Sequence, residues 1–206
     1  TGHFSLSRKE TAARRKLEAA AVAKFAGLVE YQVLDLDCGI EPTFTNRETI
    51  LRIIRRFSPD VVITHRGIDY HPDHRVTSQL VLDTAYIVTV PHYCEDTTIP
   101  AEVPVYAFSY DQFDDPRKHR ADAVIPFDCV IDEKIKLLSC HRSQFFEWLP
   151  WNVGEKDFDP DKLSEQELKE WFLKQSWFTR FETAADDARE LLKKYYGEDK
   201  ANKVKY

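Results

Sequence analysis

Short β-branched runs alternate with helical patterns through the first half of the chain, and this alternation most constrains the fold. Alternating strands and helices predict an α/β fold with a mainly parallel sheet and helices on both of its faces. The run DVVITH at 60–65 is apolar enough to be an internal strand that is buried on both faces. The strand-like runs are YQVLDL at 31–36, DVVITH at 60–65, VPVYAF at 103–108 and AVIPFD at 123–128.

Helix start and stop signals surround these runs. Ser7 and Glu10 fit a capping box ahead of a helix over 8–26, and Gly27 is placed to end that helix. The segment TNRE at 45–48 fits a second capping box, followed by apolar residues at helical spacing. Further helices are predicted at 74–88, 130–147, 164–175 and 180–196, so the C-terminal region is predicted to be helical.

Charge and composition exclude some classes of partner. The chain carries 29 Lys and Arg against 35 Asp and Glu, and no basic face gathers that could follow phosphates, so we expect no nucleic-acid partner. No run of about 18 apolar residues predicts a transmembrane segment, and the opening TGHFSLSRKE lacks a signal-peptide pattern. The four cysteines form no CxxC pair and are expected to be reduced thiols. We therefore predict a cytoplasmic protein, and the sequence leaves a homo-oligomer open.

The segment GIDYHPDHR at 67–75 places His71, Asp73 and His74 just after the strand-like run 60–65. Ligands of open α/β sheets bind beyond the carboxyl ends of the strands. Three interpretations are open: a metal site, an acid–base site, or a polar turn. Two histidines are too few to hold zinc alone, because a catalytic zinc normally has three protein ligands. Asp73 favours a functional site, since a carboxylate beside a histidine can fix its tautomer.

The longer segment PDVVITHRGIDYHPDHR at 59–75 resembles the second signature of the PIG-L or LmbE-like family of metal-dependent N-acetylglucosaminyl deacetylases. The resemblance implies a Rossmann-like three-layer fold. It also implies hydrolysis of the acetamide of an N-acetylglucosamine-type sugar or conjugate, so a small amino sugar would be the partner. Other segments agree with the family in order: GH at 2–3, RRKLEAAA at 14–21, NRETILRIIRRFSPDVV at 46–62 and HRSQFFEWLP at 141–150.

Site roles follow from the resemblance. It implies that His74 ligates the metal, usually zinc, with other divalent ions left open. His71 would face the substrate carbonyl, and Asp73 would be the carboxylate that supports His71. Arg15 and His3 would contact the substrate.

Several of these residues also have ordinary structural interpretations. Arg15 is well placed for an exposed helix pair with Glu18, and His3 could simply pack in a turn. His65, at the end of a strand, more simply satisfies backbone groups than binds metal. A group of aromatic side chains at and beyond the end of the predicted helix 130–147 could form a sugar-stacking wall, but aromatics there are more often core: Phe145, Phe146, Trp148 and Trp151.

The sequence departs from the family in one respect. The first family signature, His-Pro-Asp-Asp, supplies the other ligands and the general base, and it has no counterpart here. Since the sequence has no Met and begins at Thr1, we expect the natural protein to extend upstream by about 40 residues, the length of a strand, loop, helix and strand. We predict a single deacetylase domain over 1–206 without its N-terminal strand, in which 151–206 is a helical C-terminal extension.

Two alternatives to the deacetylase stay open. One is a non-catalytic carbohydrate-binding or interaction domain that has the same fold without the metal. The other is a metal phosphoesterase, which we favour less because no Gly-rich phosphate cradle accompanies HPDH.

Overall fold

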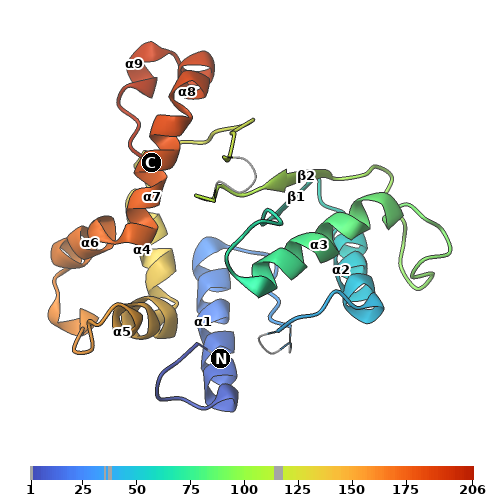
Figure 1. The fold of residues 1–206 in the computed structure, drawn as a ribbon, viewed down its shortest axis with the longest axis horizontal. Coiled ribbons are helices and arrows are strands. Elements are labelled where there is room, and N and C mark those ends of the chain that lie inside the picture. The colour runs from blue at the N-terminus through green and yellow to red at the C-terminus, as the bar shows by residue number, and fades with distance from the viewer. Residues whose placement is uncertain (1, 35, 37–38, 114–117) are drawn as a thin grey trace. The chain divides into compact units, whose positions relative to one another are not determined.

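The structure is a computed structural model that describes residues 2–34, 36, 39–113 and 118–206 (Figure 1). It divides into a first unit, formed by 1–35 and 120–206, and a second unit, formed by 36–119. The second unit contains α2 (Phe44–Phe57), β1 (Val61–Thr64), α3 (Pro72–Ile87) and β2 (Val105–Phe108). A single domain over 1–206 stays a prediction.

The first unit is helical in its described residues. Its α-helices are α1 (Arg8–Ala26), α4 (Ile131–Ser139), α5 (Leu149–Asn152), α6 (Glu165–Lys174), α7 (Ser176–Asp187), α8 (Arg189–Tyr196) and α9 (Glu198–Ala201). Two short 3-10 helices, η1 (Asp128–Val130) and η3 (Pro160–Lys162), and a π-helix, η2 (Ser143–Trp148), lie between them. The predicted helical C-terminal region is confirmed.

The two strands form a parallel sheet, as the alternation predicts. Val61 of β1 lies opposite Val105 of β2, and the register runs on to the strand ends. On one face of the sheet, Val62 and Tyr106 pack against a core that includes Leu51 of α2. The chain therefore has a mixed α/β fold with a small parallel sheet.

The apolar sequence of β1 predicts a strand that is buried on both faces, and this prediction is wrong. Val61 is 50 % exposed and Ile63 is 69 % exposed, while the alternate residues face the core. Among the described residues the sheet has two strands, so β1 has one neighbour and one covered face.

Two other strand predictions are also wrong. The described residues of 31–36 form no strand, because nothing in the described chain pairs with them. The run 123–128 is not a strand either. Val124 packs against the cluster of Ala185, Leu192 and Ala201, and the Phe127 ring contacts Phe181 of α7, while Ile125 is 81 % exposed. Part of the hydrophobicity of this run therefore reflects a loop that packs on helices.

The helix caps explain where the helices begin. Ser7 and Glu10 form the predicted capping box of α1, and Gly27 ends this helix with a φ of 64°, a left-handed conformation that glycine adopts at little cost. The predicted box at 45–48 is wrong, because Thr43 caps α2 through the Asn46 amide.

Aromatic side chains build the core of the first unit. Phe145 and Phe146 pack with Phe172 and Phe178, as expected of core residues.

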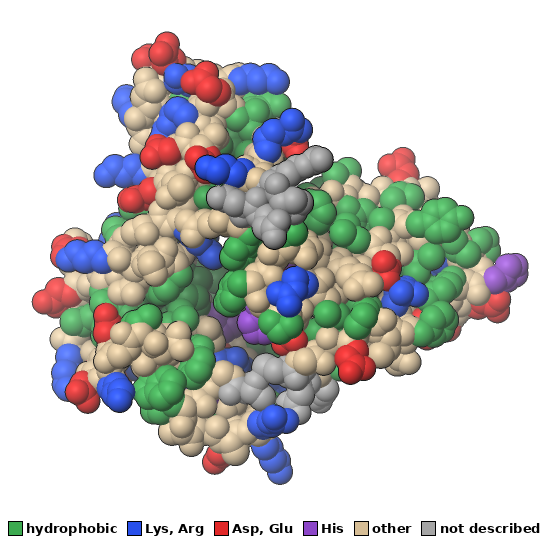
Figure 2. Space-filling view, viewed as in Figure 1, with side chains coloured by type: hydrophobic (Ala, Val, Ile, Leu, Met, Phe, Trp, Pro, Cys, Tyr) green, Lys and Arg blue, Asp and Glu red, His purple; other side chains and the backbone are tan. Residues whose placement is uncertain are grey.

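No helix of the described chain is both long and apolar enough to cross a membrane. On the face shown in Figure 2, acidic and basic side chains are interspersed.

Candidate metal and acid–base site

The chain between β1 and α3 carries the candidate site. β1 ends at Thr64 and α3 begins at Pro72, so the segment 65–71 lies beyond the carboxyl end of the strand, as predicted. Pro72 suits the first helical position because its φ is already helical and its missing N–H would be unpaired there. His71 caps α3, since its Nδ1 accepts a hydrogen bond of 3.1 Å from the Asp73 amide.

Three side chains converge on one point in this segment. One ligand atom from each of His65, Asp69 and His74 lies within 4.8 Å of the other two. The Asp69 carboxylate faces one edge atom of each ring: Oδ1 is 3.0 Å from His74 Nδ1, and Oδ2 is 4.0 Å from His65 Nδ1. The two imidazoles are stacked, with ring centroids 4.1 Å apart and planes at 4°. Asp69 is only 8 % exposed, so a buried carboxylate lies at the centre of the cluster.

The donor set fits a divalent metal ion. His74 Nδ1 is buried and makes no hydrogen bond, although Asp69 Oδ1 lies nearby. A buried polar atom without a hydrogen bond is costly and calls for an explanation. Two imidazoles and one carboxylate are three ligands of the kinds that zinc takes, and three is the number that catalytic zinc sites use. A cation bound beside His74 Nδ1 would give this nitrogen a partner.

Partial burial favours the neutral form of one of these rings. Desolvation lowers the pKa of His65 below its ordinary value, and the neighbouring His74 lowers it further. A histidine with a lowered pKa is neutral near pH 7, which is the state in which imidazole binds a metal.

His71 has a different environment from His74. Because Nδ1 accepts the capping hydrogen bond, the neutral ring carries its proton on Nε2. The ring stacks on His74 with centroids 4.7 Å apart, and its side chain is 37 % exposed. His71 therefore offers a hydrogen-bond donor at the edge of the cluster.

The carboxylate of Asp73 holds the neighbouring loop. Its Oδ1 accepts hydrogen bonds from the amides of Gly39 at 2.8 Å and Ile40 at 3.2 Å. Its Oδ2 lies 4.0 Å from His71 Nδ1, which is engaged with the Asp73 amide. Support of the His71 ring by Asp73 stays a prediction. The carboxylate that closely approaches a histidine of HPDH is that of Asp69.

An ion pair joins the loops that follow the two strands. Arg66 binds Asp111 with two hydrogen bonds and also donates to the Phe113 carbonyl at 2.7 Å. Burial acts to raise the pKa of the Asp111 carboxyl, but the hydrogen bonds from Arg66 and the Phe113 amide hold this pKa below its usual value. The loop that carries His65 is thereby tied to the end of β2.

In the first unit, Arg15 does not form the surface pair with Glu18. Its Nη2 donates to the Gly2 carbonyl at 2.8 Å and to Gln144 Oε1 at 2.6 Å, and its Nε is buried without a hydrogen bond. Glu18 is buried and accepts from the amide and hydroxyl of Ser143. These bonds fasten α1 to the π-helix η2.

His3 also belongs to the contacts between α1 and η2. Its Nε2 lies 2.8 Å from Glu147, and its Nδ1 accepts from the amides of Ser5 and Leu6. Arg14 of α1 pairs with the same Glu147 carboxylate. Both ring nitrogens of His3 are therefore engaged within the protein. Substrate contacts of His3 and Arg15 stay predictions.

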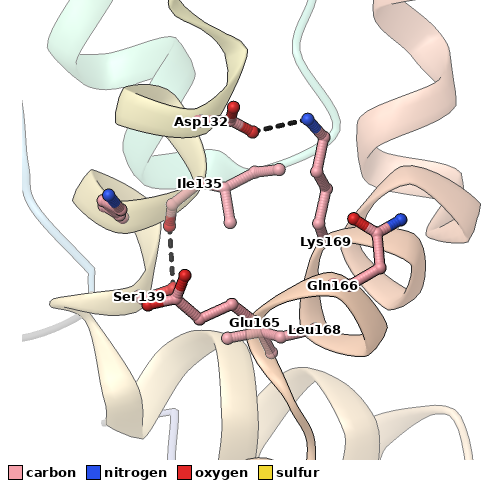
Figure 3. A pocket seen from close by; sticks show the side chains of 8 residues that line it. Asp132, Ile135, Ser139, Glu165, Gln166, Leu168 and Lys169 are labelled. Carbon is pink, nitrogen blue, oxygen red and sulfur yellow. Dashed lines mark hydrogen bonds and ion pairs between the residues drawn. The ribbon is translucent and has the colours of Figure 1, made fainter.

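A separate pocket of about 510 Å³ opens in the first unit between α4 and α6 (Figure 3). An ion pair of 2.6 Å between Lys169 and Asp132 closes one side of it. None of the predicted site residues lines this pocket, and its four charged side chains balance. It is lined by Asp132, Ile135, Lys136, Ser139, Glu165, Gln166, Leu168 and Lys169.

Sequence reasoning missed two members of the cluster. From the sequence, His65 is expected to satisfy backbone groups, and Asp69 carries no prediction. The sequence holds a signal for both, because His65, Asp69 and His74 lie within ten residues around the strand end. Three potential ligands in such a short segment meet the number that a zinc site needs.

A protein-family model matches the part of the chain that contains the candidate site. The family model described as PIG-L, GlcNAc-PI de-N-acetylase, matches this chain from residue 1 to residue 85. Residues 1–85 match the PIG-L family. The matched segment contains α1, α2, β1 and nearly all of α3, and it includes the whole His65, Asp69 and His74 cluster. The predicted resemblance to the PIG-L family is confirmed.

Solved structures similar to this PIG-L-like chain share its fold. N,N'-diacetylchitobiose deacetylase from Pyrococcus horikoshii aligns with a TM-score of 0.63 at 23 % identity, over 74 % of this chain and 60 % of its own. GalB, the 4-carboxy-2-hydroxymuconate hydratase from Pseudomonas putida KT2440, also reaches 0.63, at 19 % identity over 93 % of this chain and 69 % of its own. A conserved protein from Thermus thermophilus reaches 0.56 at 18 % identity, over 82 % of this chain and 68 % of its own.

These structural neighbours do not by themselves fix a reaction. A deacetylase and a hydratase share the fold, and function depends on the site more than on the fold. The chain spans 60 % of the length of the deacetylase that it matches.

Proposed function

We propose that the protein is a metal-dependent hydrolase that removes the acetyl group from an N-acetylglucosamine-type sugar or conjugate. The observation that carries this proposal is the convergence of His65, Asp69 and His74 at the carboxyl end of β1, with a buried imidazole nitrogen that lacks a hydrogen bond. The match of residues 1–85 to a family described as a de-N-acetylase supports the choice of substrate.

His65, Asp69 and His74 would hold the metal ion through two imidazoles and one carboxylate. We propose zinc, because this donor set suits it, and other divalent ions stay open. A bound ion of this kind polarises an amide carbonyl and lowers the pKa of water, which makes amide hydrolysis accessible near neutral pH.

His71 would act on the carbonyl oxygen of the substrate. Its Nε2 is free of the helix cap, so it can donate a hydrogen bond as negative charge develops on that oxygen. With a second proton on Nδ1, which would release the helix cap, the same ring could pass a proton from Nε2 to the leaving amine. Asp73 would serve this step by fixing the start of α3 and the loop at 39–40.

Three further predictions complete the proposal. His3 and Arg15 would bind the substrate, and the protein would be cytoplasmic. The fold would be Rossmann-like with three layers, a proposal that the similarity to solved structures at TM-scores of 0.56 to 0.63 supports.

Product analysis tests the proposed reaction. The full-length protein is incubated with N,N'-diacetylchitobiose, and released acetate and new primary amine are measured together. We expect equal amounts of the two products, because hydrolysis of one acetamide yields one of each. Binding of the sugar without either product would identify a non-catalytic carbohydrate-binding domain instead and would overturn the proposal.

A further inference from the structure

Tyr70 is an exposed aromatic side chain beside the metal-ligand cluster. It is 72 % exposed, although Asp69 next to it is 8 % exposed. Burial of an aromatic side chain is strongly favourable, since such a group can remove about 150–250 Å² from water. An exposed ring at a candidate site therefore offers apolar surface to a ligand.

The segment that carries Tyr70 is held in place. Arg75 of α3 donates to the backbone carbonyls of Asp69 at 2.7 Å and of Tyr70 at 2.9 Å. The His71 amide donates to the Asp69 carboxylate at 2.8 Å. The backbone on both sides of the ring is thus fixed by hydrogen bonds.

The ring itself is oriented by its neighbours. Its centroid lies 5.9 Å from that of His71 and 6.0 Å from that of His74, with planes at 82° and 78°. Phe113, from the loop after β2, packs against the ring with centroids 5.8 Å apart. The Tyr70 ring is therefore in edge-to-face contact with both histidines of HPDH.

These distances match the dimensions of an N-acetylated sugar. The acetamide carbon is two bonds from the sugar ring, roughly 2.5 Å by the dimensions of a peptide unit. A carbonyl placed at His71 and His74 would therefore leave the pyranose ring within reach of Tyr70. The C–H groups of a pyranose form an apolar face, and aromatic rings provide large, rigid apolar contacts.

We infer that Tyr70 contacts the pyranose ring of the substrate and selects cyclic N-acetyl amino sugars over acyclic acetamides. This inference rests on the proposed function and adds the residue that recognises the sugar. The hydroxyl group of Tyr70 is not needed for this role, because the contact is made by the face of the ring.

Direct binding separates this inference from the proposed reaction. Dissociation constants of N,N'-diacetylchitobiose are measured by calorimetry for the full-length protein and for Tyr70→Ala, Tyr70→Leu and Tyr70→Phe. We expect Tyr70→Ala and Tyr70→Leu to weaken binding about 10-fold, which corresponds to about 1.4 kcal/mol. Tyr70→Phe should bind like the wild type. Tyr86→Ala is the matched control, because Tyr86 lies on α3 and is 83 % exposed.

An acyclic substrate completes the test. Hydrolysis of N-acetylethanolamine should have the same kcat/KM in the wild type and in Tyr70→Ala, since it has no ring to contact. Unchanged sugar binding in Tyr70→Ala would overturn the inference and leave the proposed deacetylase standing. Equal losses for the cyclic and the acyclic substrate would also overturn it, by giving Tyr70 a general role. A wild-type protein that binds the sugar without hydrolysing it would instead refute the proposed reaction alone.

Discussion

At the scale of single residues, the position of Asp69 favours a cation site over a simple polar turn at the HPDH segment. Two histidines three residues apart are compatible with a polar turn, and the Asp69 carboxylate makes such a turn by accepting a hydrogen bond from the His71 amide, but the same buried carboxylate also lies 3.0 Å from His74 Nδ1. The same carboxylate faces His65. A histidine whose ring lies against a carboxylate in this way is suited to ligate a cation.

His74→Ala tests this assignment. Since the variant removes one of three ligands, we expect metal content, measured by elemental analysis of the purified full-length protein, to fall at least about 10-fold. His92→Ala is the control, because the side chain of His92 is 90 % exposed and pairs with the exposed Glu95. Wild-type metal content in His74→Ala would refute the ligand role.

His71 should behave differently from His74. If His71 donates a hydrogen bond to the carbonyl oxygen, His71→Ala should keep the metal, while kcat falls by about 100- to 1,000-fold, the usual cost of one such donor. Steady-state kinetics and elemental analysis of the same sample measure both effects. Loss of metal in His71→Ala equal to that in His74→Ala would show that both histidines are ligands.

At the scale of elements, the contact between the strand ends positions the site. Arg66 follows β1, Asp111 follows β2, and their ion pair is largely buried, with side chains 16 % and 11 % exposed. Because the pair joins the segment of His65 to the end of β2, its loss should loosen the candidate site as well as the second unit.

The pH dependence of this pair can be predicted with its sign. The pKa of Asp111 is lowered in the folded protein, so the ion pair stabilises the fold fully above the unfolded carboxyl pKa of about 3.9. This stabilisation is lost as the pH falls through the lower, folded pKa. Asp111→Asn should therefore cost about 1–3 kcal/mol in the free energy of unfolding at pH 7, and the difference from wild type should shrink below about pH 4.

Urea unfolding at pH 7 and at lower pH measures this difference. Glu95→Gln is the control, since that side chain is 69 % exposed, and its effect should stay within about 0.5 kcal/mol. A constant difference between Asp111→Asn and wild type at every pH would show that ionisation of Asp111 does not stabilise the fold.

Helices could be predicted from the sequence more fully than strands. The capping box of Ser7 and Glu10 and the stop at Gly27 are local signals, and α1 spans the predicted residues. A strand forms only if another segment, which can be distant in the sequence, pairs with it. The run 123–128 has the composition of a strand, but Phe127 donates its amide to the Tyr206 carbonyl and packs among helices. Composition alone does not reveal such a partner.

At the scale of the whole molecule, the sequence predicts where the site lies along the chain but does not predict how its side chains are arranged in space. HPDH lies beyond a strand end, as predicted, because parallel β1 and the following α3 place it there. The cluster depends on the path of the loop 65–71, which brings His65 back over His74. No periodicity encodes that path, so the sequence indicated His74 and missed the partners that make it a site.

Metal removal tests the central claim most directly. The full-length protein is stripped with a chelator, and acetate release from N,N'-diacetylchitobiose is measured before stripping, after stripping and after one equivalent of Zn²⁺ is returned. We expect activity to fall at least about 100-fold on stripping, because each catalytic role of a bound ion is worth several kcal/mol, and to return with zinc in the wild type but not in His74→Ala. Acetate release that persists in fully metal-free protein would contradict the account.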